Sequence, residues 1–142
     1  MSMQVVGEAR VPLAWHRQVT ARAAVGAARL LVLLPPRRLR HVLAVASRGT
    51  RAATREEALS ARRAVVTVSA RCAGRGCLQR SVATALLCRL HGHWPDWCTG
   101  FRTQPFRAHA WVEAGSEAVG EPGDVSLFHT VMSVRHRDGG RR

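Results

Sequence analysis

The residues of greatest chemical interest are a cysteine, a histidine and a glutamate that are well separated in the chain. Cys77 opens an apolar run, His109 follows 32 residues later in a segment of extended character, and Glu121 comes 12 residues after that. A thiol, an imidazole and a carboxylate are the groups of a cysteine nucleophile with its general base and its orienting acid. The sequence therefore contains the parts of a thiol-based enzyme, provided that the fold brings them together.

Each of these side chains also has an ordinary structural interpretation. A cysteine next to a leucine is often a small buried residue, and a histidine on a strand often bonds the backbone. Two carboxylates are rivals to Glu121: Glu113 lies four residues beyond His109, and Asp124 is more remote. The spacing alone leaves these alternatives open.

Four helices are predicted in the first two thirds of the chain, at residues 13–34, 37–47, 54–69 and 77–90. Thr54 and Glu57 form a capping box at the start of the third helix. A glycine-containing loop, residues 72–76, precedes the fourth helix and places Cys77 at its first turn. The partial positive charge of a helix N-terminus favours a thiolate there. The backbone N–H of Cys77 is the candidate oxyanion donor.

After the fourth helix the pattern changes to the period of two residues that is typical of strands. Strands are predicted at residues 97–103, 108–114, 118–121 and 125–134. Helices followed by an antiparallel sheet make an α+β fold, in which the helix that carries Cys77 packs on the sheet. The first dozen residues form a short strand or a loose arm. We expect a helical region at 1–53, a core at 54–134 and a disordered polar tail at 135–142, all within one compact domain.

The turn between the second and third predicted strands decides which way Glu121 points. A three-residue loop, Ala114-Gly115-Ser116, places Glu121 across from His109 on one face, with Cβ atoms about 5 Å apart. A two-residue turn, Gly115-Ser116, pairs Glu121 with Ala110 and directs it to the opposite face. We predict the three-residue loop.

Three further side chains are candidates for contact with the oxyanion or the substrate. Gln79 and Arg80 lie on the first turn of the 77–90 helix, where a solvated surface position explains them equally well. Trp111 shares the predicted face of His109. It either shields the cleft from water or belongs to the core.

The charge of the chain points to acidic partners or to an arginine-rich solvated surface. The net charge is +13, and all 22 basic residues are arginine. Because the arginines are dispersed and no stacking aromatics are interleaved with them, a nucleic-acid partner is not expected. The cysteines lack a paired C-x2-C spacing and the chain lacks a phosphate loop, so we expect no metal and no cofactor.

The hydropathy of the chain argues against a membrane protein. The longest apolar stretch, residues 19–34, is interrupted by Arg22 and Arg29, which makes a membrane span unexpected. No secretory signal is evident. The expected location is therefore the cytoplasm, where thiols remain reduced; sequence assigns no role to Cys72, Cys88 and Cys98.

Several sequence runs resemble one known family: 71–81, 86–90, 97–100, 105–106, 109–113 and 119–122. Together they resemble the leader peptidase of lasso peptide biosynthesis, the stand-alone B-type protein with a transglutaminase-like, papain-related fold. The resemblance extends over residues 30–134.

The resemblance implies a cysteine peptidase that removes the leader from a ribosomally made precursor before a separate cyclase forms a macrolactam. It places the nucleophile at Cys77, the base at His109 and the acid at Glu121, a position where many relatives carry aspartate. It also implies three partners: the leader of the precursor, a separate winged-helix-like leader-recognition protein and the cyclase. Residues 13–46 are the candidate docking surface for the recognition protein.

Two other functions remain open on the sequence alone. The same thiol chemistry serves an acyltransferase or a transglutaminase, in which an amine replaces water as the acceptor. A non-catalytic module that binds peptides would use the basic N-terminal half and would not need Cys77.

Overall fold

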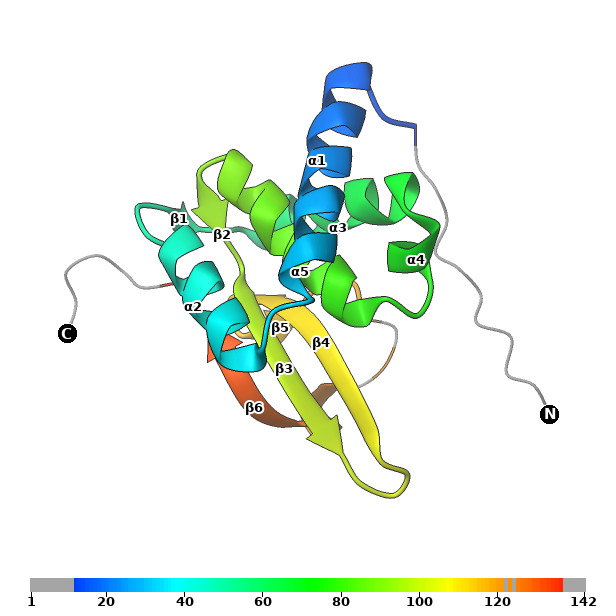
Figure 1. The fold of residues 1–142 in the computed structure, drawn as a ribbon, viewed down its shortest axis with the longest axis vertical. Coiled ribbons are helices and arrows are strands. Elements are labelled where there is room, and N and C mark those ends of the chain that lie inside the picture. The colour runs from blue at the N-terminus through cyan, green and yellow to red at the C-terminus, as the bar shows by residue number, and fades with distance from the viewer. Residues whose placement is uncertain (1–11, 122, 124, 137–142) are drawn as a thin grey trace.

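The structure is a computed structural model that describes residues 12–121, 123 and 125–136 (Figure 1). The short strand or arm predicted for the first dozen residues falls almost entirely outside this range, and so do residues 137–142 of the predicted tail. Arg135 and His136, the first two residues of that tail, are held by Asp96, which contacts the Arg135 guanidinium at 3.4 Å and accepts the His136 N–H at 2.7 Å.

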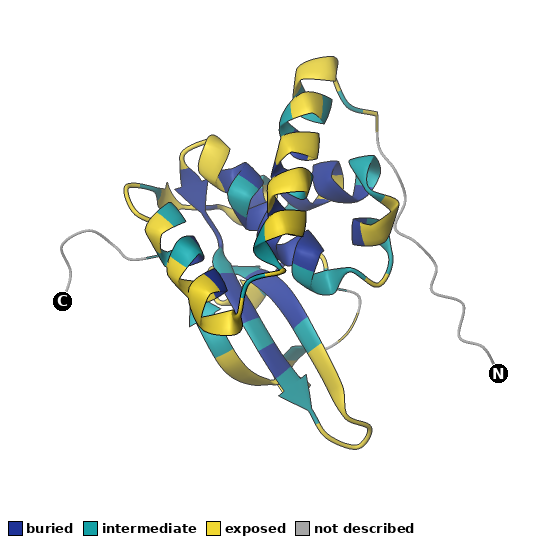
Figure 2. Ribbon diagram, viewed as in Figure 1, coloured by how far each residue is buried: buried dark blue, intermediate teal, exposed yellow. Residues whose placement is uncertain are grey.

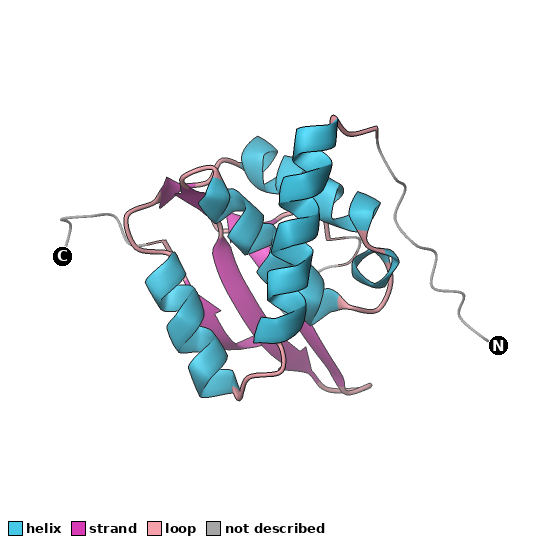
Figure 3. Ribbon diagram, turned by 45° about the horizontal axis from the view of Figure 1, so that its top comes forward, coloured by secondary structure: helices cyan, strands magenta, loops and turns pink. Residues whose placement is uncertain are grey.

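The described chain combines a layer of helices with an antiparallel sheet, and the predicted α+β class is confirmed. The helices gather on one face of the sheet (Figure 3). Their bounds are Trp15–Leu31 (α1), Pro36–Ala46 (α2), Arg55–Val68 (α3), Ala70–Ala73 (α4) and Cys77–Leu90 (α5). No described helix has the length and hydropathy needed to cross a membrane.

Local signals fix most of the helix ends. Pro36 is the first residue of α2, where its missing N–H costs nothing. The capping box predicted at Thr54 is present, since the Glu57 N–H donates to the Thr54 hydroxyl at 3.2 Å and the Glu57 carboxylate accepts from the Thr54 N–H at 3.1 Å. The predicted loop at 72–76 is only partly correct. Ser69 caps an extra helical turn, α4, by accepting the Cys72 N–H at 3.2 Å.

The main sheet has the strand order β5-β4-β3-β6. Its strands are Asp96–Arg102 (β3), Arg107–Ala114 (β4), Glu117–Ala118 (β5) and His129–Val134 (β6). Two short segments, Arg51–Ala52 (β1) and His93–Trp94 (β2), pair in parallel beside it and were not predicted.

Two of the predicted strands are shorter in the structure. The strand predicted at 118–121 ends at Ala118, and the strand predicted at 125–134 begins only at His129. Residues Val125–Leu127 form a 3-10 turn instead, which the Phe128 N–H closes by donating to the Val125 carbonyl. The reason lies in the topology, because the chain must cross from the β5 edge of the sheet to the β6 edge before it can pair with β3.

Helix α5 lies at the centre of the core. It packs against α1, α3 and β4, which explains why most of its surface is buried (Figure 2). The face of α1 that is buried consists of Ala21, Ala24 and Ala28, and such small side chains let two helices approach closely. The indole N–H of Trp97 on β3 donates to the Ser81 hydroxyl of α5 at 3.1 Å. This hydrogen bond connects the sheet to the helix near the start of α5.

Candidate active site

Cys77 is the first residue of α5, as predicted, and Gly76 is the N-cap. The N-cap position requires glycine, because a Cβ on Gly76 would lie 2.8 Å from the Arg71 carbonyl oxygen. The same oxygen accepts the Gly76 N–H at 3.0 Å. The loop is therefore folded tightly onto α4, and the thiol is held at the N-terminus of the helix.

Arg80 fixes this loop from inside the protein. Its guanidinium donates to the carbonyls of Cys72 at 3.0 Å and Gly74 at 3.1 Å, and the residue is only 8% exposed. The interpretation of Arg80 as a solvated first-turn residue is therefore wrong. Arg80 is a positioning residue for the loop, and its positive charge also helps to lower the pKa of the Cys77 thiol.

Two groups that were predicted to bind the oxyanion or the substrate instead donate hydrogen bonds to backbone carbonyls of the protein. The Cys77 N–H, the candidate oxyanion donor, donates to the Arg75 carbonyl at 2.9 Å. The buried Gln79 amide donates to the Val25 carbonyl of α1 at 3.3 Å and does not line the cleft at Cys77. The N–H of Leu78 belongs to the first turn, where helical amides have no intrahelical acceptor. It is therefore a second candidate oxyanion donor.

The thiol of Cys77 contacts the open edge of β4. Because β5 pairs only with Glu113 and Ala114, at the C-terminal end of β4, the N-terminal part of this strand edge is free to contact the start of α5. The hydrogen bond from His109 is the largest cause that lowers the pKa of Cys77 below its ordinary value, and the Ala110 N–H assists it. Burial acts in the opposite direction but is outweighed. Helix and strand thus create a thiol that is easily ionised.

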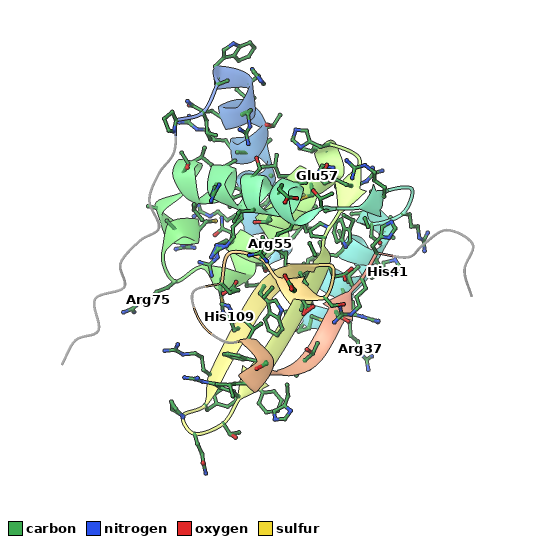
Figure 4. All side chains as sticks on the ribbon, turned by 180° about the vertical axis from the view of Figure 1, so that it is seen from behind. Arg37, His41, Arg55, Glu57, Arg75 and His109 are labelled. Atoms are coloured by element: carbon green, nitrogen blue, oxygen red, sulfur yellow. The ribbon has the colours of Figure 1, made fainter. Side chains whose placement is uncertain are left out.

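Glu121 completes the set by binding the other side of the imidazole. Its Oε2 atom accepts from His109 Nε2 at 2.8 Å, and the carboxylate side chain is only 7% exposed. This contact leaves Nδ1 to face Cys77. The hydrogen bond with Cys77 and then the hydrogen bond with Glu121 raise the pKa of His109 to about 9, against the effect of burial. Figure 4 shows His109 on β4. The three predicted catalytic side chains therefore meet.

The predicted hairpin register is wrong. Ala114 pairs with Glu117, so that Gly115 and Ser116 form a two-residue turn rather than part of a three-residue loop. Both turn residues have positive φ, 60° for Gly115 and 68° for Ser116, as the tightest hairpin turns require. Serine at the second position accepts the left-handed conformation here.

Glu121 reaches His109 by another route. The strand β5 ends at Ala118, and Gly120 then turns the chain with φ 70°. A Cβ on Gly120 would lie 2.6 Å from Cδ of Arg62, so both the conformation and the space require glycine. The two-residue hairpin turn alone would direct Glu121 to the face of the sheet opposite His109. The turn at Gly120 reverses this and brings the carboxylate to the imidazole.

The rival carboxylates do not take this role in the described chain. Glu113 lies 3.6 Å from the Cys98 sulfur and 3.3 Å from the Arg135 guanidinium. Asp124 lies outside the described residues. Glu121 is thus the carboxylate that binds His109.

An aromatic cluster supports the imidazole. Trp111 is buried and stacks on His109 with ring centroids 5.9 Å apart. It does not line the cleft at Cys77, so it belongs to the core beneath the imidazole. Phe128 packs against both rings, at 5.6 Å from His109 and 6.0 Å from Trp111. Sequence reasoning missed Phe128, because no local pattern distinguishes it from the other apolar residues of its segment.

The cleft in front of Cys77 and His109 has a volume of about 600 Å³. Its walls are mainly apolar and come from the α1–α2 connection, the starts of α2 and α5, and three strands. Its apolar lining comprises Val32, Leu34, Pro36, Leu39, Leu78, Phe101, Ala108, Ala110, Val131 and Met132. No cluster of three or more metal-binding side chains occurs among the residues that the structure describes. The cleft suits an apolar side chain next to a reacting carbonyl.

The four thiols, all free, are expected to differ sharply in reactivity. Iodoacetamide at pH 7 should modify Cys77 first, because its pKa is lowered, whereas burial raises the pKa of Cys72 and raises that of Cys88 and Cys98 to about 12. Peptide mass mapping over time measures the four rates. In urea all four thiols should react alike, and equal rates in the native protein would contradict the assignment of Cys77.

Comparison with known proteins agrees with this geometry. The chain matches the family model of the transglutaminase-like superfamily over residues 21–133, from α1 to β6, a span that contains Cys77, His109 and Glu121. Searches of curated proteins and of solved structures give no significant match. Because the family model covers most of the chain and the thiol, imidazole and carboxylate lie together within it, this protein belongs to the transglutaminase-like superfamily.

Proposed function

We propose that the protein is a cysteine peptidase that removes the leader from a lasso peptide precursor. The superfamily includes cysteine peptidases and acyltransferases. The observation that carries thiol chemistry is the pairing of Cys77 with His109 at a helix N-terminus, at the edge of an apolar cleft. The resemblance of residues 71–122 to the leader peptidases supports the choice of substrate.

The geometry supports a two-step acyl transfer. The Cys77 thiolate attacks the scissile carbonyl, and the His109 imidazolium gives its proton to the departing amine, so that a thioester forms as the C–N bond breaks. Neutral His109 then takes a proton from water, which attacks the thioester. The acid product leaves and the thiolate–imidazolium pair is restored. Glu121 keeps the imidazole oriented throughout.

We propose that a separate leader-recognition protein delivers the precursor. The outward face of α1 and the connection that follows it support a protein contact, because Trp15 and Leu30 on α1 and Leu33 after it are 77%, 69% and 79% exposed. Such a partner would cover this apolar surface while the leader enters the cleft.

Mass spectrometry of a reconstituted reaction tests the proposal. The protein is mixed with a precursor peptide and a recognition protein encoded by neighbouring genes, with and without hydroxylamine. Two products whose masses sum to the precursor plus one water identify a peptidase. Hydroxylamine captures the thioester of either enzyme as a hydroxamate, so the deciding result is the reaction without it. Cleavage that occurs only when an amine is present identifies an acyltransferase and overturns the hydrolytic assignment. An unchanged precursor, with Cys77 inert toward iodoacetamide, would leave only a binding module.

A further inference from the structure

A second concave surface adjoins the active-site cleft. The basic groove, as we name it, has a volume of about 740 Å³ and lies between α2 and β6. Its lining residues are Pro36, Arg37, Arg40, His41, Ala44, Ser47, Arg48, Gly49, Met132, Ser133, Val134 and Arg135. Figure 4 labels two of them, Arg37 and His41. The groove is larger than the cleft itself.

The basic groove contains no carboxylate. The chain has no Asp or Glu between Glu8 and Glu56, so α2 supplies only cations. Among the described residues, no carboxylate pairs with Arg37, Arg40 or Arg48. By contrast, Arg51 pairs with Glu57 and Arg55 with Glu117 outside the groove, and on the β6 side of the groove Arg135 pairs with Asp96 and Glu113. On the α2 side of the groove, therefore, no described carboxylate compensates the positive charge of Arg37, Arg40 and Arg48.

The groove and the cleft share two lining residues. Pro36 and Met132 line both, so the two hollows meet at the start of α2. Leu39 and Leu43 direct one face of α2 into the core, and Arg37 and Arg40 of the same helix line the groove. Figure 2 shows that much of α2 is exposed. A peptide chain that leaves the cleft past Pro36 enters a channel lined by Arg37 and Arg40 of α2 and by Arg48 just beyond the helix. Arg40 also donates to the Ser133 carbonyl at 3.5 Å.

We propose that the basic groove binds an acidic segment of the peptide substrate that flanks the scissile bond. This inference rests on the proposed function, since it treats the cleft as the place where the peptide reacts. Helix α2 has 11 residues and is about 16 Å long, which matches about five residues of extended peptide. The carboxylates therefore lie within the first five or six residues beyond the apolar residue that fills the cleft.

The lining favours a peptide over a nucleic acid. Nucleic-acid channels combine cations with aromatic side chains on which bases stack. The basic groove has no Phe or Trp in its lining and continues into an apolar cleft that faces a thiol. Carboxylates of a peptide would bind guanidinium groups by charge-assisted hydrogen bonds while its apolar residue fills the cleft.

Binding measurements on the Cys77→Ala protein test the groove without requiring turnover. Fluorescein-labelled peptides carry four leucines joined to four glutamates, placed before the leucines in one peptide and after them in another, with matched glutamine versions. We expect one glutamate peptide to bind at least about tenfold more tightly than its glutamine counterpart by anisotropy, and this advantage to shrink as NaCl rises toward 1 M. Equal affinities of both glutamate peptides and their counterparts would overturn the proposal.

A pair of variants locates the binding. Arg37→Gln with Arg48→Gln should abolish most of the glutamate advantage. The control, Arg22→Gln with Arg29→Gln, removes the same charge from exposed positions on α1 and should retain it. Circular dichroism verifies the fold of each variant. Equal losses in both variants would show that overall charge, rather than the groove, attracts the peptide.

A protection assay links the groove to the cleft. In the wild-type protein the tighter glutamate peptide should slow iodoacetamide labelling of Cys77, and the glutamine peptide at equal concentration should do so less. Binding without protection would place the peptide outside the cleft and overturn its role as substrate. A single-stranded DNA that displaces the peptide and binds more tightly would overturn the choice of a peptide ligand. If Cys77 does not react with iodoacetamide, the proposed function is contradicted instead. The anisotropy measurements do not depend on the reactivity of Cys77.

Discussion

The Cys77→Ala protein is expected to fold normally and to lose its catalysed turnover, by a factor of about 10⁴ or more. The substitution removes the sulfur atom that forms the acyl-enzyme, and we expect no other described thiol to replace it. Cys77 is only partly buried at the first position of α5, where alanine is compatible with a helix. Initial rates of precursor cleavage and circular dichroism measure the two parts of this prediction.

A buried cysteine provides the matched control. Cys88 lies in the core on the same helix, and Cys88→Ala should lower thermal stability while leaving the rate per folded molecule unchanged. His109→Ala adds a second readout, because the main cause that lowers the pKa of Cys77 is then lost and burial raises it. Alkylation of Cys77 at pH 7 should slow accordingly. Cleavage by Cys77→Ala at the wild-type rate would exclude Cys77 as the nucleophile.

The features that sequence predicted well depend on local chemistry. The helix start at Cys77 follows from a glycine-containing loop before an apolar run, and the capping box at Thr54 needs only residues that are three apart. The strands β3 and β4 follow from alternation between polar and apolar residues. These signals act within one or two turns of chain, so tertiary contacts did not override them.

The features that sequence missed depend on contacts between distant segments. The hairpin register turned on whether Ser116 accepts a positive φ, which spacing does not reveal. Arg80 looks like a surface residue in the sequence, yet it is buried because the carbonyls of the preceding loop surround its guanidinium. Phe128 contacts His109 only because the chain crosses the sheet between β5 and β6.

The prediction that Cys77, His109 and Glu121 lie together succeeded for a different reason. Three residue types at suitable distances along the chain indicated which side chains to examine, but not how they meet. The expected route, a facing pair across a hairpin, is wrong, and the turn at Gly120 supplies the contact instead. The prediction of the residues was thus more robust than the prediction of the backbone that positions them.

Substitution of Glu121 should change both the rate and its dependence on pH. Glu121→Ala removes the acceptor for His109 Nε2, so the imidazole loses its orientation and kcat should fall by about 10²- to 10⁴-fold. The imidazolium must donate its proton to the leaving amine, and activity should therefore decline as pH rises through the His109 pKa of about 9. Because Glu121 helps to raise this pKa, its removal should move the alkaline decline to lower pH.

Two further variants separate charge from orientation. Glu121→Gln can retain a hydrogen bond without the negative charge, so its loss of kcat should be smaller than that of Glu121→Ala while the alkaline decline still moves to lower pH. Glu113→Gln removes the same charge from β4, at a site that contacts Cys98 and Arg135 rather than His109, and should leave the decline in place. Profiles of kcat against pH from 5 to about 10 compare the variants, since they bracket the titration of the thiol and the imidazole. If the alkaline decline of Glu121→Ala stays at the wild-type pH, this carboxylate does not raise the pKa of His109. The orienting acid would then have to be sought elsewhere in the chain.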